Sequence, residues 1–385
     1  MRKLVNIAVC GKFHYLNYVG ILNDSEIINN FFFSHKRSTG RGLESGVMRT
    51  FNSYPKEYLV QAHLRIFGPR LPWLFYFYEF FWQRAVLRNW SKAKILHFLA
   101  NGTTASLQIR ARLDGSLLLA EAVNTHPLHR INLLKKEASS AGVDASNLIV
   151  NDRHLSTIDE CWGADGLLVP SEIVRKSFID YGYTKPIYKI PYAANTSRFQ
   201  RKSKESYSKT GFLRIICVGE IGLRKGQRYL LEAARNFAGK VHVTLVGRYS
   251  YDGHELVKKY QGEFRHLESV QSEKMPELLR QHDVMILPSL EEGLAVSVCE
   301  AMASGLAVLT TVEAGGGEII TDDVDGILIN SSSAESIDIA IEFLLRDRKE
   351  VIRLGTNASL RMSARGSWDK YATDLCKVYS EFEHH

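Results

Sequence analysis

Two glutamates eight positions apart, Glu292 and Glu300, are the residues whose type and spacing most clearly suggest chemistry. Residues 284–287 have the pattern of a short buried strand, residues 296–304 that of an amphipathic helix, and residues 307–311 that of another strand. This order places Glu292 in the loop at the carboxyl end of a sheet and Glu300 one or two turns into the helix. Open α/β sheets bind their ligands at that edge, so the two acids suit a polyhydroxylated substrate that carries phosphate.

An alternative explanation is that both glutamates are solvated acids near a helix amino terminus, where the helix dipole favours negative charge.

A chain of 385 residues is too long for one ordinary core and predicts two domains. Strand and helix patterns alternate in both halves, so the expected class is α/β, with two doubly wound parallel sheets that face a cleft. The expected strands are residues 5–10, 95–98, 117–123, 166–169, 213–218, 242–246, 284–287 and 307–311, and the expected helices are residues 130–141, 173–181, 227–236, 296–304 and 368–382.

The composition indicates a globular protein of a reducing compartment, since 45% hydrophobic and 24% charged residues are ordinary for a folded domain. Five widely spaced cysteines form neither a metal-binding pattern nor a disulfide framework. The amino terminus runs directly into an expected strand without the cleavage site of a signal peptide. No stretch approaches the roughly 18 apolar residues of a membrane-spanning helix, so we expect a cytoplasmic location.

Positive charge is concentrated in the first part of the chain, where residues 1–112 contain 16 Lys and Arg against 5 Asp and Glu, a net charge of +11. Within this part, residues 66–98 interleave aromatic with basic side chains: Trp73, Phe75, Tyr76, Phe77, Tyr78, Phe80, Phe81, Trp82 and Trp90 with Arg70, Arg84, Arg88, Lys92 and Lys94. Such a segment is typical of a helix in the interface of an anionic membrane. The alternative is a buried aromatic helix of the first domain. The two interpretations are compatible if one face of the helix packs in the core and the other faces solvent. Single-stranded nucleic acid also binds such surfaces, but no nucleic-acid motif accompanies this one, so we expect no nucleic-acid partner.

The segment around the two glutamates resembles the signature of retaining glycosyltransferases of the GT-B fold, glycosyltransferase family 4 (glycosyl transferases group 1). The signature has Pro-Ser, then Glu-Gly-aromatic-Gly, four residues, Glu-Ala-Met-Ala, and a later Gly and Val. The matching residues are Pro288, Ser289, Glu292, Gly293, Glu300, Ala301, Met302, Ala303, Gly305 and Val308. The chain departs from it at Leu294, where an aromatic is usual, and at Ala295, where a second Gly is usual. The added methyl of Ala295 could narrow the sugar pocket.

The resemblance extends to residues 214–234, which are similar to the strand–loop–helix opening of the family's donor domain. Gly219 belongs to its Val-Gly element and Lys225 to its Lys-Gly element. Lys225 would then hold the donor's diphosphate, where negative charge develops on the departing phosphate. The family commonly has Arg after Val-Gly, but this chain has Glu220, so Arg224 is the replacement cation. Taken alone, an Arg-Lys pair is better explained by a solvated loop.

Other segments resemble the walls of the family's cleft. Gly11 follows the first expected strand, and residues 101–103 follow the second. His126 follows the third, where a His of the family reaches the donor sugar and the reacting centre; a turn-capping role, or His129 in its place, is the alternative. A glycine triplet that includes Gly316 would offer bare backbone amides to phosphate or sugar oxygens.

An Asp-x-Asp pattern at Asp323 and Asp325 is one that metal-dependent sugar transferases of another fold use. Before Gly326 it has the composition of a surface turn. GT-B enzymes stabilise the diphosphate with cations and helix termini rather than a bound metal, so we expect no metal and no other cofactor. No G-x-G-x-x-G follows the first strand, which argues against a dinucleotide-binding fingerprint.

The resemblance implies four parts: an acceptor-binding domain (1–199), a polar linker (200–211), a nucleotide-sugar-binding domain (212–366) and a terminal helix that crosses back to the first domain (367–385). The implied reaction is a retaining transfer from a UDP-, GDP- or ADP-linked sugar to a glycan or lipid-linked acceptor.

In this scheme the catalytic residues are His126, Glu292, Lys225 and Arg224, and the donor-binding residues are Glu300, Gly293, Leu294, Ala295, Gly11, Gly219 and Gly316. The basic first domain favours surface polysaccharide or lipopolysaccharide assembly at the inner face of the cell membrane. A sugar-nucleotide epimerase or a phosphorylase of the same fold, and an inactive membrane-surface assembly module, are the alternative functions.

Overall fold

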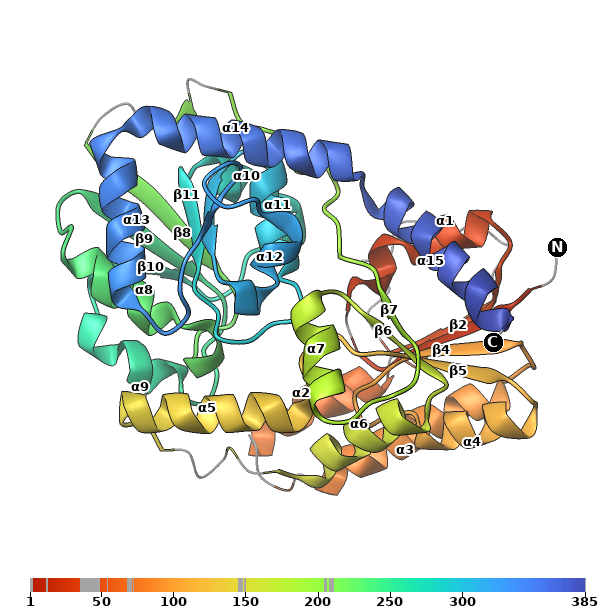
Figure 1. Ribbon diagram of the computed structural model, residues 1–385. Helices are drawn as coiled ribbons and strands as arrows, with labels where there is room; N and C mark the ends of the chain where they lie inside the picture. The colour runs from red at the N-terminus through yellow and green to blue at the C-terminus, as the bar shows by residue number, and fades with distance from the viewer. Residues whose placement is uncertain are drawn as a thin grey trace.

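The computed structural model describes residues 3–11, 13–34, 49–53, 55–67, 71, 73–144, 148, 150–203, 206–207 and 211–384. Two lobes lie side by side, each built on one parallel sheet with helices on both faces (Figure 1). The expected α/β class with two doubly wound sheets is confirmed.

The first sheet has seven strands in the order β3-β2-β1-β4-β5-β6-β7. Its strands are β1 (Val5–Val9), β2 (Ile28–Phe33), β3 (Arg49–Asn52), β4 (Ile95–Leu99), β5 (Leu117–Glu121), β6 (Gly166–Val169) and β7 (Ile187–Lys189). Its helices are η1 (His14–Asn17), α1 (Val19–Asp24), α2 (Pro55–Phe67), α3 (Trp73–Arg88), α4 (Ala105–Leu113), α5 (Pro127–Ala141), α6 (Asp152–Gly163) and α7 (Glu172–Asp180). Because helices cover both faces, β1 and β4 are buried along their whole length, which explains why Asn6 in β1 and His97 in β4 are their only polar residues.

The second sheet has six strands in the order β10-β9-β8-β11-β12-β13. Its strands are β8 (Leu213–Val218), β9 (Val241–Val246), β10 (Phe264–Leu267), β11 (Val284–Leu287), β12 (Ala307–Thr310) and β13 (Ile327–Leu328). Its helices are η4 (Leu223–Lys225), α8 (Gln227–Arg235), α9 (Gly253–Val257), η5 (Lys258–Tyr260), η6 (Ser272–Lys274), α10 (Met275–Arg280), α11 (Val296–Ala303), η7 (Val312–Ala314), α12 (Gly316–Ile319), α13 (Ala334–Arg346) and α14 (Arg348–Arg365).

In each sheet the strand order reverses between two central neighbours, β1 and β4 in the first and β8 and β11 in the second. The loops that follow neighbouring strands on the two sides of such a reversal diverge and leave a crevice at the carboxyl edge. The loops after β8 and β11 carry Lys225 and Glu292, so the strand order itself brings these two residues to one place.

The last helix, α15 (Trp368–Glu383), leaves the second domain after α14 and lies against the first sheet (Figure 1). Its Tyr379 hydroxyl is 2.6 Å from Nδ1 of His97 on β4. The described part of residues 200–211, expected as a linker, packs on the second domain: Lys202 pairs with Asp283 at 3.2 Å, and the Tyr207 hydroxyl donates to the Gly305 carbonyl. Residues 204–205 and 208–210 lie outside the described residues.

Candidate functional site

The loop after β8 presents two adjacent cations, Arg224 and Lys225, in the short helix η4. Gly226 follows with φ +66°, and a Cβ there would lie 2.2 Å from the carbonyl oxygen of Pro288. Only glycine permits both the left-handed backbone and this close approach, which holds the loop after β8 against the loop after β11. Gly219 lies against the side chain of Lys225, because a Cβ at Gly219 would be 3.3 Å from that side chain.

Glu292 lies in the loop after β11 and contacts both cations. Nζ of Lys225 donates to Oε1 of Glu292, and Nη1 of Arg224 lies 2.9 Å from the same oxygen. Lys225 is buried, and this burial, followed by the neighbouring Arg224, lowers the pKa of its ammonium group to about 7. The site therefore combines a desolvated lysine, a guanidinium and a carboxylate within one hydrogen-bonded group.

Glu300 is the fifth residue of α11 and is half-buried. Burial raises the pKa of its carboxyl to about 7, while Arg198 acts in the opposite direction. A carboxylate with this pKa is held in its charged form only weakly, so it suits a hydrogen bond to a neutral hydroxyl group.

Gly293, Leu294 and Ala295 connect Glu292 to α11 at the boundary between the domains. A Cβ on Gly293 would lie 1.8 Å from the carbonyl oxygen of Val123 in the first domain. The Gly293 carbonyl accepts a hydrogen bond from the Ser171 hydroxyl at 2.5 Å. Leu294 and Ala295 are 3% and 4% exposed, so both departures from the family pattern are buried in this loop.

Glu291, next to Glu292, was not predicted as a functional residue. Its Oε1 accepts from the backbone N–H of Thr125 at 2.9 Å and from the Thr125 hydroxyl at 2.8 Å, across the boundary between the domains. Its other carboxylate oxygen lies 3.5 Å from Arg224, so Glu291 links the first domain to the cation pair. Two consecutive acids carry no sequence signal that separates the contacts of Glu291 from those of Glu292.

His126 lies in the first domain at the amino end of α5. Its Nδ1 accepts a hydrogen bond from the backbone N–H of Leu128 at 3.3 Å, as a helix cap, and only 2% of the residue is exposed. The ring stacks on Tyr181 with 4.1 Å between centroids. Burial lowers the pKa of His126 to about 4, so the ring is neutral near neutral pH. The position fits the capping alternative; a part in the reaction stays a prediction.

The two glycine-containing loops expected at the cleft also have structural contacts. The backbone N–H of Gly11 donates to the Ser34 hydroxyl at 2.9 Å. The N–H of Gly316, at the start of α12, donates to the Thr311 carbonyl at 3.1 Å. The amide of Gly316 is therefore not bare, because the turn that begins α12 already uses it.

The Asp-x-Asp segment forms a turn between α12 and β13. Asp325 accepts from the backbone N–H of Thr321 at 2.7 Å and pairs with Arg361 at 3.5 Å. Asp323 lies 3.7 Å from Arg353. Among the described residues, no cluster of three or more His, Cys, Asp or Glu side chains could hold a metal ion.

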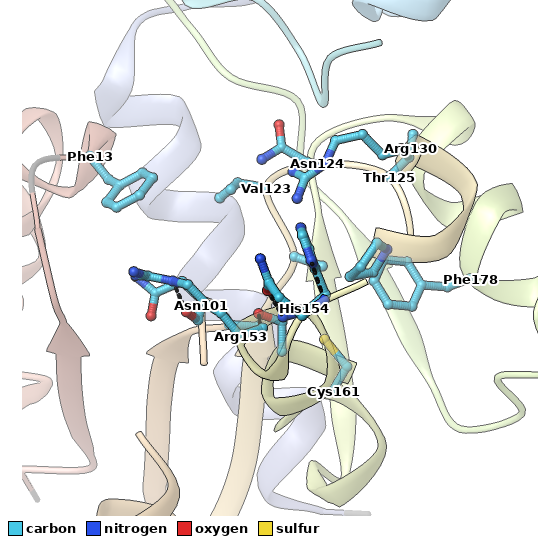
Figure 2. A pocket seen from close by; sticks show the side chains of 15 residues that line it. Phe13, Asn101, Val123, Asn124, Thr125, Arg130, Arg153, His154, Cys161 and Phe178 are labelled. Carbon is cyan, nitrogen blue, oxygen red and sulfur yellow. Dashed lines mark hydrogen bonds between the residues drawn. The ribbon is translucent and has the colours of Figure 1, made fainter. Parts of the chain in front are cut away.

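A cavity of about 180 Å³ lies in the first domain at the carboxyl ends of its central strands (Figure 2). Arg130 of α5 and Arg153 and His154 of α6 line it together with Asn101, Asn124, Thr125 and Phe13. Thr125 also binds Glu291, so the cavity borders the contact between the domains. No sequence pattern pointed to Arg130, Arg153 or His154, because they come together only through the packing of α5 and α6.

Comparison with known proteins gives a family match over part of the chain. Residues 198–361 match the family model described as Glycosyl transferases group 1. An uncharacterised glycosyltransferase of Methanocaldococcus jannaschii is 29% identical over 171 residues, which cover 43% of this chain and 44% of the relative. The N,N'-diacetylbacillosaminyl-diphospho-undecaprenol alpha-1,3-N-acetylgalactosaminyltransferase of Campylobacter jejuni is 37% identical over 83 residues, 22% of each chain. The matched segments thus span less than half the length of these relatives.

The fold likeness covers the whole chain. The structure of HepE from Anabaena, solved with UDP and glucose, superposes with a TM-score of 0.69 over 98% of this chain and 99% of that one, at 14% identity. This likeness establishes the architecture alone. The second domain therefore matches the Glycosyl transferases group 1 family over residues 198–361, and the chain as a whole has the two-domain GT-B fold.

Proposed function

We propose that this protein is a retaining, metal-independent glycosyltransferase that moves a sugar from a nucleotide-sugar donor, bound by the second domain, to an acceptor bound by the first. The observation that carries the proposal is the contact of Lys225 and Arg224 with Glu292 at the carboxyl edge of the second sheet. Cations and a carboxylate at one sheet edge fit a donor that carries both a diphosphate and a hydroxyl-bearing sugar. The match to the Glycosyl transferases group 1 model and the UDP and glucose in the HepE structure support this assignment.

The donor is held by charge and by hydrogen bonds. Lys225 and Arg224 bind the diphosphate, and Glu300 accepts hydrogen bonds from the ribose hydroxyls. Glu292 leaves the cations as the diphosphate takes its place and then accepts hydrogen bonds from the transferred sugar. UDP-, GDP- and ADP-linked sugars are the candidate donors.

Transfer takes place on one face of the sugar. The acceptor hydroxyl oxygen forms a bond to the anomeric carbon as the bond from that carbon to the phosphate oxygen breaks. The electron pair of the broken bond goes to the phosphate, which takes the acceptor's proton, so the anomeric configuration is retained. Lys225 and Arg224 stabilise the developing negative charge, and positioning with electrostatics lowers the barrier.

The acceptor in our proposal is a glycan or a lipid-linked sugar at an anionic membrane surface. Helix α3 supports the membrane assignment: its Trp82 is buried, whereas Phe77, Phe80 and Phe81 are 56%, 52% and 50% exposed. Phe77 and Phe81 share a helical stripe with Arg84 and Arg88 at i, i+4, i+7 and i+11. Exposed aromatics continued by basic residues suit an anionic bilayer surface.

Helix α3 lies with α4 along the outer edge of the first domain, away from the second (Figure 1). Arg70 and the side chain of Trp73 lie outside the described residues. No helix among the described residues is both long and apolar enough to cross a bilayer. The Campylobacter relative, whose name describes a lipid-diphosphate acceptor, supports a lipid-linked acceptor here.

A ligand panel followed by product analysis tests this function. A ligand that binds only the native state at 100 times its Kd stabilises it by about 2.7 kcal/mol, so one of UDP, GDP and ADP should raise the melting temperature by several degrees. NMR of the product from the matching nucleotide sugar should show the donor's anomeric configuration, with turnover unchanged by EDTA. A new nucleotide sugar formed without acceptor would identify an epimerase, and sugar 1-phosphate formed from a glycan would identify a phosphorylase. Tight vesicle binding with no turnover would identify an assembly module.

A further inference from the structure

The cavity of the first domain has an unusual balance of charge. None of the fifteen residues that line it is an aspartate or a glutamate, whereas Arg130, Arg153 and His154 all line it. Figure 2 shows Arg130 of α5 and His154 of α6 on one side of the cavity, whereas Arg153 of α6 extends towards Asn101 on the other side. Asn101 and Asn124 also line the cavity, and Nδ2 of Asn101 donates to the Cys10 carbonyl at 3.1 Å.

Arg130 is the central cation. No hydrogen bond or ion pair of its guanidinium is found among the described residues. Burial and the nearby Arg224 lower the pKa of Arg130, whereas Glu291 raises it. A guanidinium stays protonated in proteins, so Arg130 carries a permanent charge. No carboxylate among the described residues lies within ion-pair distance of this half-buried charge. Such a charge is costly unless an anion pairs with it.

The partners of the other two basic residues leave donors available to the cavity. Arg153 donates through Nε to the Asn101 carbonyl at 3.1 Å and lies 3.3 Å from Glu79 through one terminal nitrogen. Nδ1 of His154 accepts from the backbone N–H of Asn151, and Nε2 has no hydrogen bond to the part of the chain that the structure describes. Burial lowers the pKa of His154, and the nearby Arg130 and Arg153 lower it further.

We infer that this cavity binds a phosphate or diphosphate group of the acceptor. Donors that converge from α5, from α6 and from the loops after β4 and β5 match the several oxygens of a phosphate better than the two of a planar carboxylate. The donor's own diphosphate has separate cations on the second domain, at Lys225 and Arg224. This inference rests on the proposed function, because it names the acceptor class for the same reaction.

The position of the cavity fits that role. Thr125 lines the cavity and also binds Glu291, which directly precedes Glu292. A phosphate held at Arg130 therefore lies on the first-domain side of the transfer site, and the sugar attached to it reaches towards the second domain. A soluble sugar phosphate and a lipid-linked diphosphate share this chemistry.

Anion binding tests the cavity independently of transfer. Inorganic pyrophosphate is titrated by calorimetry into the variant Arg224→Gln/Lys225→Gln, in which the donor cations are neutral, and into the same variant with Arg130→Gln added. Pyrophosphate should bind the first protein and bind the second at least tenfold more weakly. Arg110→Gln is the matched control, because Arg110 lies on α4 of the same domain, outside the cavity, and pairs with Asp114 at the surface. Equal affinity with and without Arg130 would overturn the inference.

Acceptor kinetics separate this inference from the proposed function. With Arg130→Gln alone, KM for a phosphorylated acceptor should rise at least tenfold, KM for the nucleotide sugar should stay within twofold, and Arg130→Lys should recover part of the loss. A sugar phosphate and a lipid-linked diphosphate are compared as acceptors to identify the source of the group. Equal rates of transfer to phosphorylated and unphosphorylated acceptors, in both the wild type and Arg130→Gln, would overturn the inference while the proposed function survives. Pyrophosphate binding that depends on Arg130, without any sugar transfer, would support the phosphate site and overturn the proposed function.

Discussion

The carboxylate of Glu292 neutralises the ammonium group of Lys225 across the crevice between the loops after β8 and β11. The nearest guanidinium nitrogen of Arg224 lies 2.9 Å from the same carboxylate. The proposed diphosphate site is therefore occupied by an internal anion in this structure. A donor must exchange its phosphates for Glu292, and that exchange frees the carboxylate for the transferred sugar.

Nucleotide affinity should depend on pH through two groups. Glu300, with its pKa raised to about 7, must be ionised to accept from ribose, and Lys225, with its pKa lowered to about 7, must be protonated to hold phosphate. Affinity should therefore be highest near pH 7 and fall several-fold by pH 5.5 and by pH 8.5, as measured by calorimetry. Glu300→Gln should flatten the acidic limb and Lys225→Gln the alkaline limb. Constant affinity from pH 5.5 to 8.5 would contradict both roles.

The ionised form of Glu300 should also lower the free energy of unfolding. Its folded pKa of about 7 lies above the ordinary glutamate pKa of about 4.5, so the folded state binds the proton more tightly. Stability therefore falls as pH rises between these two values, and the whole penalty is present above pH 7. Glu300→Gln should raise the free energy of unfolding at pH 8 by about 1–3 kcal/mol and change it little at pH 4.5. Denaturant titration at both pH values measures this, and an equal effect at both would refute the assignment.

Gly293→Ala should disturb the contact between the domains. The new Cβ would lie 1.8 Å from the Val123 carbonyl oxygen, so the loop and the first domain must move apart. Overpacking of this kind costs about 1–3 kcal/mol. Gly317→Ala is the control, because its Cβ would meet nothing closer than 4.0 Å. Unfolding free energy should fall only in Gly293→Ala, along with turnover; similar behaviour of the two variants would show that the contact is unimportant.

The exposed aromatic stripe of α3 should bind anionic vesicles. Phe77→Ser/Phe81→Ser should weaken sedimentation with phosphatidylglycerol vesicles about tenfold, because two apolar anchors are lost. High salt should weaken binding of the wild type, since charge attraction is screened. Ile339→Ser/Leu360→Ser is the control, because these residues are 64% and 60% exposed on the second domain. An equal loss of vesicle binding in both variants would rule out this surface. Vesicle binding that does not change with salt or with lipid charge would do the same.

Much of the fold could be predicted because its strands are buried on both faces. The expected bounds of β6, β8 and β11 agree with the structure, and those of β4 and β12 differ by one residue. Strand β2 was missed since its sequence begins with Ile-Asn-Asn, and polar residues break an apolar pattern. The structure buries Asn30 by pairing its amide with Asn6 at 3.0 Å, a long-range contact that no local pattern reveals.

The candidate site was predictable to the extent that it follows single strands. Lys225 and Glu292 each follow a central strand, so their meeting depends only on the order of the strands. Arg130 and Glu291 could not be assigned in this way. The surroundings of Arg130 come from the packing of α5 against α6, and those of Glu291 come from the contact between the domains. Sequence spacing carries no information about either arrangement.

The most direct measurement of the central claim is turnover and nucleotide affinity of Glu292→Gln, side by side with wild type. The substitution keeps the side chain's size but removes the charge that neutralises Lys225 and Arg224. We predict that turnover falls about 100-fold or more, because the group that orients the transferred sugar is lost. Nucleotide diphosphate affinity should stay the same or rise a few-fold, because the cations no longer have a competing anion. Turnover within twofold of wild type would contradict the account.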